Sequence, residues 1–300
     1  MGRLCYNGRM AYFDTHVHLM PPRRLASLIR WMKRAIPSHP VAEDTPLDAL
    51  VAELRANGAV WLVNHVFPLK VGEAPDLHDF NARLATEIPR LLPFAGVHPD
   101  DPDRVRETVR ALDKLGLVGV KIHCMVQRVD PWDARLHPVY AELARRRRPL
   151  WLHTGYEDFY HFAFPDDHLR RLAEGFPDMP VVLAHAIFPR LETAFALAAD
   201  YPNVYLDMTN VFGSVVHAAE YAPGTPPAAV ERMREVLRAG VERHAGRVMF
   251  GTDHPVGLGD VAQILGDMQS VAVAEEARRA MLWETPVTLF SQWAARRLDA

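Results

Sequence analysis

The sequence predicts an α/β protein, a (β/α)8 TIM barrel formed by residues 1–300 as a single domain, with an extended first βα loop and C-terminal helices. Eight short apolar runs alternate with longer stretches of helical periodicity, a pattern typical of parallel strands joined by helices. Polar residues gather where several of these runs end, and in a barrel those ends surround one mouth. A doubly wound open sheet would alternate in the same way, but the count of eight favours the barrel.

The runs that we expect to form strands are rich in β-branched residues and are bounded by polar turns. They are Ala11–Val17, Ala59–Val66, Leu92–Val97, Leu117–His123, Pro149–His153, Val181–His185, Val204–Asp207 and Val248–Thr252. Helices are expected between them, for example at Leu47–Asn57, Asp103–Leu115, Pro138–Arg146, Leu169–Gly175, Leu191–Asp200 and Ala228–His244. The long connection from Leu19 to Asp44 has the spacing of an amphipathic helix. A lid or dimer-forming helix over the barrel mouth and a helix packed on the outside of the barrel are two equal interpretations of it.

Composition excludes several functional classes. The net charge of −3 gives no basic field for nucleic acid, and no apolar run reaches the roughly 18 residues of a membrane span. Cys5 and Cys124 form neither a disulfide framework nor a metal clip, and the N-terminus lacks the apolar region of a secretory signal. We therefore expect a cytoplasmic protein that acts on a small molecule, and the helix after Leu19 makes a homodimer reasonable.

The first strand ends in Asp14-Thr15-His16-Val17-His18, within a chain of fifteen histidines. Residues two apart in a strand face the same way, so both imidazoles face one volume. Two imidazoles on a strand form half of a zinc-type site. A single His-x-His is weak support, because it arises by chance in a histidine-rich chain.

Other strands end in the same manner. The fifth and sixth end at His153 and His185, and the eighth is followed by Asp253. One buried histidine alone is most simply a structural residue. Four strands that end in groups able to bind metal or carry a proton together predict a metal site.

The fourth strand adds Lys121 and His123, which have equal parity and are expected to face the barrel interior. A buried lysine is costly unless it is paired or modified. Lys121 is interpreted as an amine that orients substrate, as a carbamylated bridge between two metals, or as a salt-bridge partner of a buried acid. His123 is a candidate metal ligand or substrate contact.

In chain order these residues resemble the amidohydrolase superfamily, and the resemblance extends from Asp14 to about Phe290. The motifs that carry it are Asp14-x-His16-x-His18, His153, His185 and Gly251-Thr252-Asp253-His254-Pro255. They are most similar to the amidohydrolase-related (amidohydrolase 2) branch, which includes mononuclear zinc hydrolases and aminocarboxymuconate-semialdehyde decarboxylase-like enzymes.

The resemblance implies a role for each matching residue. His16, His18, His153 and Asp253 would hold a divalent metal, expected to be Zn²⁺ at one ion per chain. Asp253 would also take a proton from water, and His185 would be a second ligand or would orient water or polarise substrate. Lys121 matches a position that is carbamylated in relatives with two metals, so a second ion is expected only if Lys121 is carbamylated.

Three functions are weighed on these grounds. The first is a metal-dependent hydrolase that activates water to cleave a C–O or C–N bond in a small carboxylate, lactone or amide. The second is a non-oxidative decarboxylase on the same site, and the third is an inactive barrel that only binds. His98, His123 and Tyr156 lie near strand ends, where substrate contacts are expected. The histidines expected at the surface are His39, His78, His137, His161, His168, His217 and His244.

Overall fold

The computed structural model describes residues 5–6, 9–218 and 224–298. The chain divides into two compact units. Met1–Val63 together with Met208–Ala300 form the first unit, and Asn64–Asp207 form the second. The prediction that residues 1–300 act as a single domain stays a prediction.

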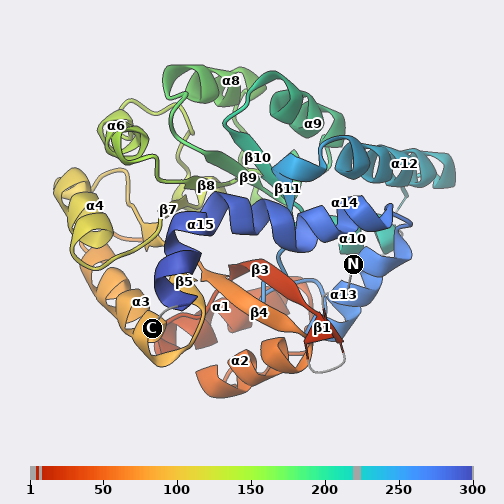
Figure 1. The fold of residues 1–300 in the computed structure, drawn as a ribbon, viewed down its shortest axis with the longest axis horizontal. Helices are drawn as coiled ribbons and strands as arrows, with labels where there is room; N and C mark the ends of the chain where they lie inside the picture. Colours follow the sequence, from red (N-terminus) through yellow and green to blue (C-terminus); the bar gives the residue numbers. More distant parts are fainter. Residues whose placement is uncertain (1–4, 7–8, 219–223, 299–300) are drawn as a thin grey trace. The chain divides into compact units, whose positions relative to one another are not determined.

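The second unit is built on a parallel sheet whose strands follow one another in chain order (Figure 1). These strands are β6 (Ala95–Gly96), β7 (Val120–Ile122), β8 (Leu150–His153), β9 (Val181–Ala184) and β10 (Val204–Asp207). Lys121 pairs with Gly96 on one side and with Trp151 on the other. Nearly all strand residues are buried, as expected for a parallel sheet that is covered on both faces.

Helices alternate with the strands of this unit, and α4, α6, α8 and α9 lie outside the sheet in Figure 1. The unit also contains the short strand β5 (Leu91–Pro93). Its helices are α3 (Ala74–Glu87), α4 (Arg104–Asp113), α5 (Cys124–Gln127), α6 (His137–Arg146), α7 (Glu157–Tyr160), α8 (Asp166–Gly175), η1 (His185–Ile187) and α9 (Leu191–Asp200).

The first unit is centred on β3 (Tyr12–Val17), which neighbours β4 (Ala59–Asn64). On the other side of β3 runs the segment that continues from β11 (Val248–Met249), since Thr15 N–H donates to Phe250 O at 3.0 Å and Val17 pairs with His254 in a parallel bridge. A small hairpin of β1 (Cys5–Tyr6) and β2 (Arg9–Met10) precedes β3.

Helices at both ends of the chain cover the strands of the first unit, and Phe13 on β3 stacks between Trp61 and Phe290 at 5.7 and 5.6 Å. These helices are α1 (Pro22–Ala35), α2 (Leu47–Ala56), α10 (Val211–Val216), α12 (Pro227–Arg243), η2 (Ala245–Arg247), α13 (Val261–Ser270), α14 (Glu275–Arg279), η3 (Ala280–Glu284) and α15 (Thr285–Leu298). Among the described residues, none of the helices has the length and apolar character needed to cross a membrane.

Each of the eight predicted strands contains an observed strand, which confirms the predicted order of an α/β fold. The strand expected at Leu92–Val97 is split into β5 and β6, and the one expected at Val248–Thr252 is ordered as a strand only over Val248–Met249. The helix expected within Leu19–Asp44 is α1, whose Leu25, Ile29 and Met32 are buried. Its apolar side chains therefore pack within this chain, and the homodimer stays a prediction.

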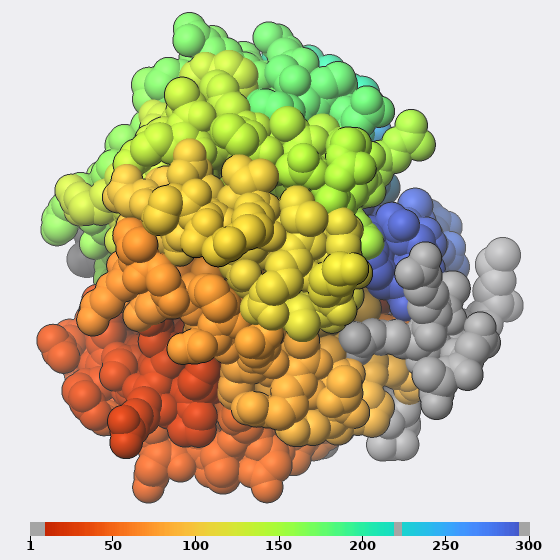
Figure 2. Space-filling model, turned by 90° about the vertical axis from the view of Figure 1, so that its left-hand side faces the viewer, coloured from red at the N-terminus to blue at the C-terminus, as the bar shows by residue number. Residues whose placement is uncertain are grey.

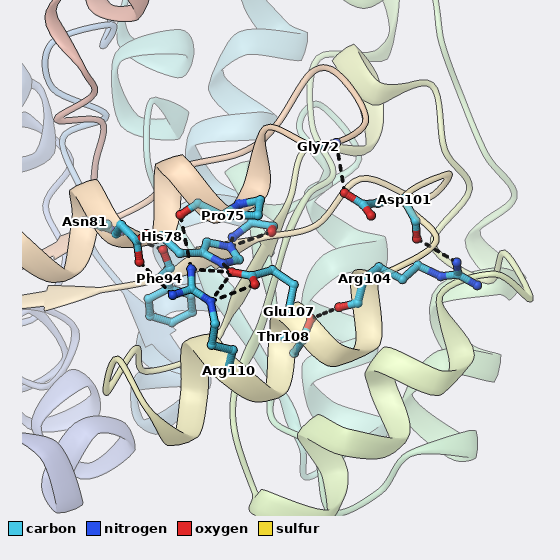
Figure 3. A network of polar contacts seen from close by, with 12 residues as sticks. Gly72, Pro75, His78, Asn81, Phe94, Asp101, Arg104, Glu107, Thr108 and Arg110 are labelled. Atoms are coloured by element: carbon cyan, nitrogen blue, oxygen red, sulfur yellow. Dashed lines mark hydrogen bonds and ion pairs between the residues drawn. The ribbon is translucent and has the colours of Figure 1, made fainter.

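A polar network joins α3, α4 and the end of β6 in the second unit (Figure 3). His78 is fully buried, with Nδ1 2.7 Å from Glu107 Oε1. Its Nε2 lies 3.0 Å from Gly96 N and 2.9 Å from Gly96 O, so it can accept from the N–H or donate to the carbonyl, according to the tautomer. The prediction that His78 lies at the surface is wrong, because Glu107 and Gly96 provide a hydrogen-bond partner for each nitrogen of a buried imidazole.

Arg110 completes the network by donating to both oxygens of Glu107 and, at 2.9 Å, to Asp79. Burial alone would raise the pKa of Glu107, but the hydrogen bonds from His78 and Arg110 outweigh it and lower this pKa to about 2. The helices that this network connects form one continuous orange-to-yellow surface in the space-filling view (Figure 2).

Glu107→Gln is expected to lower the free energy of unfolding at pH 7 by about 2 kcal/mol, because hydrogen bonds to a charged group are lost. The pKa of Glu107 is lower in the folded protein than in the unfolded chain, so its contribution is full above the unfolded value and is lost as pH falls toward about 2. Urea unfolding at pH 7, 5 and 3 should show that the difference in the free energy of unfolding between wild type and variant becomes smaller as the pH falls. Glu231→Gln, at an exposed position on α12, is the control, and a difference independent of pH would contradict this account.

Candidate functional site

His16, His18 and Asp253 bring three potential metal-binding atoms together in the first unit. The Nε2 atoms of His16 and His18 lie 3.2 Å apart. Asp253 Oδ1 lies 3.3 Å from His18 Nε2 and 3.6 Å from His16 Nε2. All three residues are buried, and the three atoms are close enough to hold one metal ion.

The spacing of these atoms fits a divalent ion. Zinc binds imidazole nitrogen at about 2.0–2.1 Å with tetrahedral geometry, so two of its ligand atoms lie about 3.3 Å apart. The observed separations of 3.2, 3.3 and 3.6 Å are close to this value. Two imidazoles and a carboxylate are also a donor set that zinc accepts.

Hydrogen bonds beneath the three residues hold β3 against the loop that carries Asp253. The buried carboxylate of Asp14 accepts from His16 N–H at 3.2 Å, and from the N–H and the hydroxyl of Thr252 at 3.0 and 2.7 Å. Asp253 N–H donates to His16 O at 2.8 Å. The first residue of the Asp-x-His-x-His motif therefore has a structural task, which is to fix the two histidines relative to Asp253.

Asn210 contacts the Asp253 carboxylate and was missed by the sequence reasoning. Its Nδ2 donates to Asp253 Oδ2 at 2.7 Å. Both residues have left-handed backbones, with φ of 64° for Asn210 and 60° for Asp253. The available signal was its position three residues beyond the strand Val204–Asp207, at the strand end where polar residues gather.

Two further buried histidines in the first unit are biased toward the neutral form. Burial, and then the nearby His39, lower the pKa of His254 to about 4. Burial, and then Lys33, also lower the pKa of His39. The prediction that His39 lies at the surface is wrong, because it is only 3% exposed. A neutral His254 adds no positive charge beside Asp253.

His123, His153 and His185 form a second cluster of rings, within the second unit. His185 Nε2 lies 3.1 Å from His153 Nδ1. The rings of His123 and His153 stack with centroids 3.8 Å apart and planes inclined by 13°. Tyr160 stands edge-on to both, at 5.4 and 5.0 Å. This cluster brings the ring nitrogens of three histidines together within the second unit.

The turn after β9 holds His185 in a strained backbone. His185, Ala186 and Ile187 have φ of 62°, 45° and 54°, a conformation that is costly for residues other than glycine and most of all for a β-branched one. Tyr156, itself at φ 65°, packs its ring 5.3 Å from that of His185. A Cβ on Gly155 would come within 2.7 Å of His185 Cβ, so this close approach requires glycine. Such strain is typical of functional positions.

Lys121 and His98 complete the predicted positions in this unit. Lys121 is fully buried on β7, two residues before His123. Burial raises the pKa of the neighbouring Cys124 thiol to about 12, against the opposing effect of the Lys121 charge. His98 is partly exposed, and its Nδ1 accepts from Asp100 N–H at 3.2 Å, so its ring is engaged with its own loop.

Gln127 was also missed, and it supports His123 from the short helix α5. Its Oε1 accepts from His123 N–H at 2.8 Å. Its Nε2 donates to Pro68 O at 3.0 Å and to Val97 O at 2.6 Å. One amide therefore connects three strand-end loops around His123, through contacts that no local pattern predicts.

Comparison with known proteins gives a family match over nearly the whole chain. The family model described as Amidohydrolase matches residues 13–292. Among curated proteins, protein fluG of Emericella nidulans is 37% identical over 82 residues, which make up 27% of this chain and 10% of that protein. The chain thus spans about a tenth of the length of this relative.

Solved structures share the fold at low sequence identity. An uncharacterised TIM-barrel protein from Bordetella bronchiseptica has a TM-score of 0.72 at 19% identity, over 94% of this chain and 99% of its own. A protein named as a 2-pyrone-4,6-dicarboxylic acid hydrolase of Pseudomonas putida has a TM-score of 0.64 at 19% identity, over 94% and 97%. A 5-carboxyvanillate decarboxylase of Novosphingobium aromaticivorans with bound manganese has a TM-score of 0.61 at 13% identity, over 94% and 97%. These likenesses confirm the predicted fold class.

Proposed function

The chain belongs to the amidohydrolase family, and on that premise we propose that it is a metal-dependent hydrolase that cleaves a C–O or C–N bond in a small carboxylate, lactone or amide. The observation that carries this proposal is the convergence of His16, His18 and Asp253 on one point at zinc-like spacing. His153 is proposed as a further ligand on the family resemblance. When bound, a divalent ion would supply Lewis acidity and a water nucleophile at neutral pH.

Asp253 is proposed to carry the proton. Its carboxylate takes a proton from the attacking water and later gives it to the leaving group. Support comes from its burial and from the Asn210 bond, which engages Oδ2 while Oδ1 faces the two imidazoles.

His185 and Lys121 are proposed to stabilise negative charge that develops on the substrate. Buried donors are effective in this role because they need no rearrangement at the moment of reaction. The strained turn and Gly155 hold His185 in place, and the rigid strand β7 holds Lys121. His123, Tyr156 and His98 are proposed to contact substrate, with His98 the least supported because its ring is bonded to its own loop.

The test of this function is metal content by elemental analysis of protein purified without chelators or a His-tag. About one zinc or manganese ion per chain is expected in the wild type, since one donor cluster of this kind is found in the described part of the chain. The His16→Ala/His18→Ala variant should lose the ion. The His168→Ala/His244→Ala variant removes two histidines outside the cluster and should retain it.

Each result of this measurement has a defined meaning. Two ions per chain would favour a carbamylated Lys121. No ion in the wild type, even after reconstitution with Zn²⁺ and Mn²⁺, would contradict the proposed function.

A decarboxylase is the second candidate, and the likeness to a structural relative that is named as a decarboxylase supports it. The manganese-containing structural relative is named as a decarboxylase. Release of CO2, measured beside release of acid or alcohol, separates the two reactions.

A further inference from the structure

Asn210 has an unusual conformation for a residue at the start of a helix. It precedes α10 with φ 64° and ψ −13°, in the left-handed region that asparagine tolerates better than most residues. Asparagine in this position commonly caps its own helix with its side chain. Here the side chain makes no such bond. It is turned instead toward Asp253 and Leu258.

Both ends of the Asn210 amide are used in this orientation. Oδ1 accepts from Leu258 N–H at 3.1 Å, and Nδ2 donates to Asp253 Oδ2 at 2.7 Å. A backbone N–H can only donate and an ionised carboxylate can only accept. The reversed amide would place donor against donor and acceptor against acceptor, so the orientation is fixed by chemistry.

The two oxygens of Asp253 thereby have different surroundings. Oδ2 is held by Asn210, and Oδ1 lies 3.3 Å from His18 Nε2 and 3.6 Å from His16 Nε2. The final torsion of an aspartate side chain is broad, so a carboxylate without a fixed donor samples many planes. The bond from Asn210 Nδ2 at 2.7 Å favours the plane in which Oδ1 lies near both imidazoles.

We propose that Asn210 is a positioning residue, which fixes the plane of the Asp253 carboxylate and so prepares His16, His18 and Asp253 for a divalent ion. This inference rests on the proposed function of that cluster. Residues that orient a metal ligand from behind typically change metal affinity or activity by about 10- to 100-fold when they are removed.

The test compares Asn210→Gly with the wild type. Glycine adopts the left-handed backbone without strain. The substitution therefore removes the side-chain amide of Asn210 while the backbone can keep its conformation. Arg147→Gly is the matched control, since Arg147 is an exposed residue at φ 51° at the end of α6. Crystal structures of the chelator-treated proteins give the plane of the Asp253 carboxylate, and Co²⁺ titration gives metal affinity and the visible absorption spectrum.

In Asn210→Gly, the Asp253 carboxylate is expected to rotate or to occupy several planes. Co²⁺ affinity should fall by about tenfold or more, with a changed spectrum. Arg147→Gly should match the wild type in both measurements. An unchanged carboxylate together with unchanged Co²⁺ affinity would overturn the proposal.

Asn210→Asp keeps the test decisive if the glycine variant does not fold. Aspartate also tolerates the left-handed backbone, and one of its oxygens can still accept from Leu258 N–H. Its other oxygen replaces the Nδ2 donor and so faces Asp253 Oδ2, acceptor against acceptor. At pH 8 the two carboxylates should turn apart, and an unmoved Asp253 would again refute the proposal. If the wild type binds no Co²⁺, the proposed metal function fails, whereas the metal-free structures still decide the role of Asn210.

Discussion

Replacement of Asp253 by asparagine is expected to lower turnover by about a thousandfold while the protein stays folded. The amide has nearly the shape of the carboxylate but cannot accept the proton of an attacking water. Its oxygen can still accept from Asn210 Nδ2, so the hydrogen bond to that residue can be retained. The substitution therefore removes a charge and a base without leaving a cavity.

Turnover would be measured on a panel of lactones, amides and esters of small carboxylates, with thermal unfolding and metal content recorded on the same samples. Asp200→Asn, at the exposed end of α9, is the matched control and should behave as wild type. Loss of turnover with the metal retained would assign Asp253 as the base. Loss of both would make it chiefly a ligand, and wild-type turnover would rule out both roles.

The elements that the sequence predicts most accurately are those whose signals are local. Leu191–Asp200 and Val204–Asp207 are observed with the predicted bounds, because an apolar periodicity and a short β-branched run decide them. Helix α3 is not predicted by its pattern. Two positions on its buried face are His78 and Asn81, and their partners Glu107 and Phe94 O lie elsewhere in the chain. Polar residues that are satisfied by distant partners interrupt an apolar stripe.

The residues of the candidate site likewise fall into those that a local pattern predicts and those that depend on distant contacts. The parity of a strand is a local property, so His16 and His18 can be placed on one face from the sequence alone. The bond between Asn210 and Asp253 joins residues 43 positions apart, and although Asn210 follows a predicted strand, no local pattern pairs it with Asp253. The left-handed backbones of His185, Ala186 and Ile187 are equally hidden, because tertiary contacts impose a conformation that these residue types disfavour.

Gly251→Ala is expected to displace the residues of the His16–His18–Asp253 cluster. The free energy of unfolding should fall by about 2–3 kcal/mol, and metal affinity should fall at least tenfold. Gly251 belongs to the segment that runs beside β3. A Cβ at this position would lie 2.5 Å from His16 Cβ, 2.8 Å from His16 N and 2.5 Å from Thr209 Oγ1. Two of these atoms belong to His16, and its backbone amide is held by Asp14, so the strand cannot retreat without moving a residue that is proposed to bind the metal.

The control is the same substitution of glycine by alanine at Gly266, where the added Cβ has room. Gly266 lies exposed within α13, and no atom lies within 4 Å of the Cβ that an alanine would add there. Gly266→Ala should therefore raise the free energy of unfolding by up to about 1 kcal/mol, from helix propensity alone, and leave metal affinity unchanged. Urea unfolding and Co²⁺ titration of both variants separate the close approach at His16 from a general effect of alanine. Wild-type affinity in Gly251→Ala would mean that the strand yields without displacing His16, and that the cluster is less rigid than its hydrogen bonds imply.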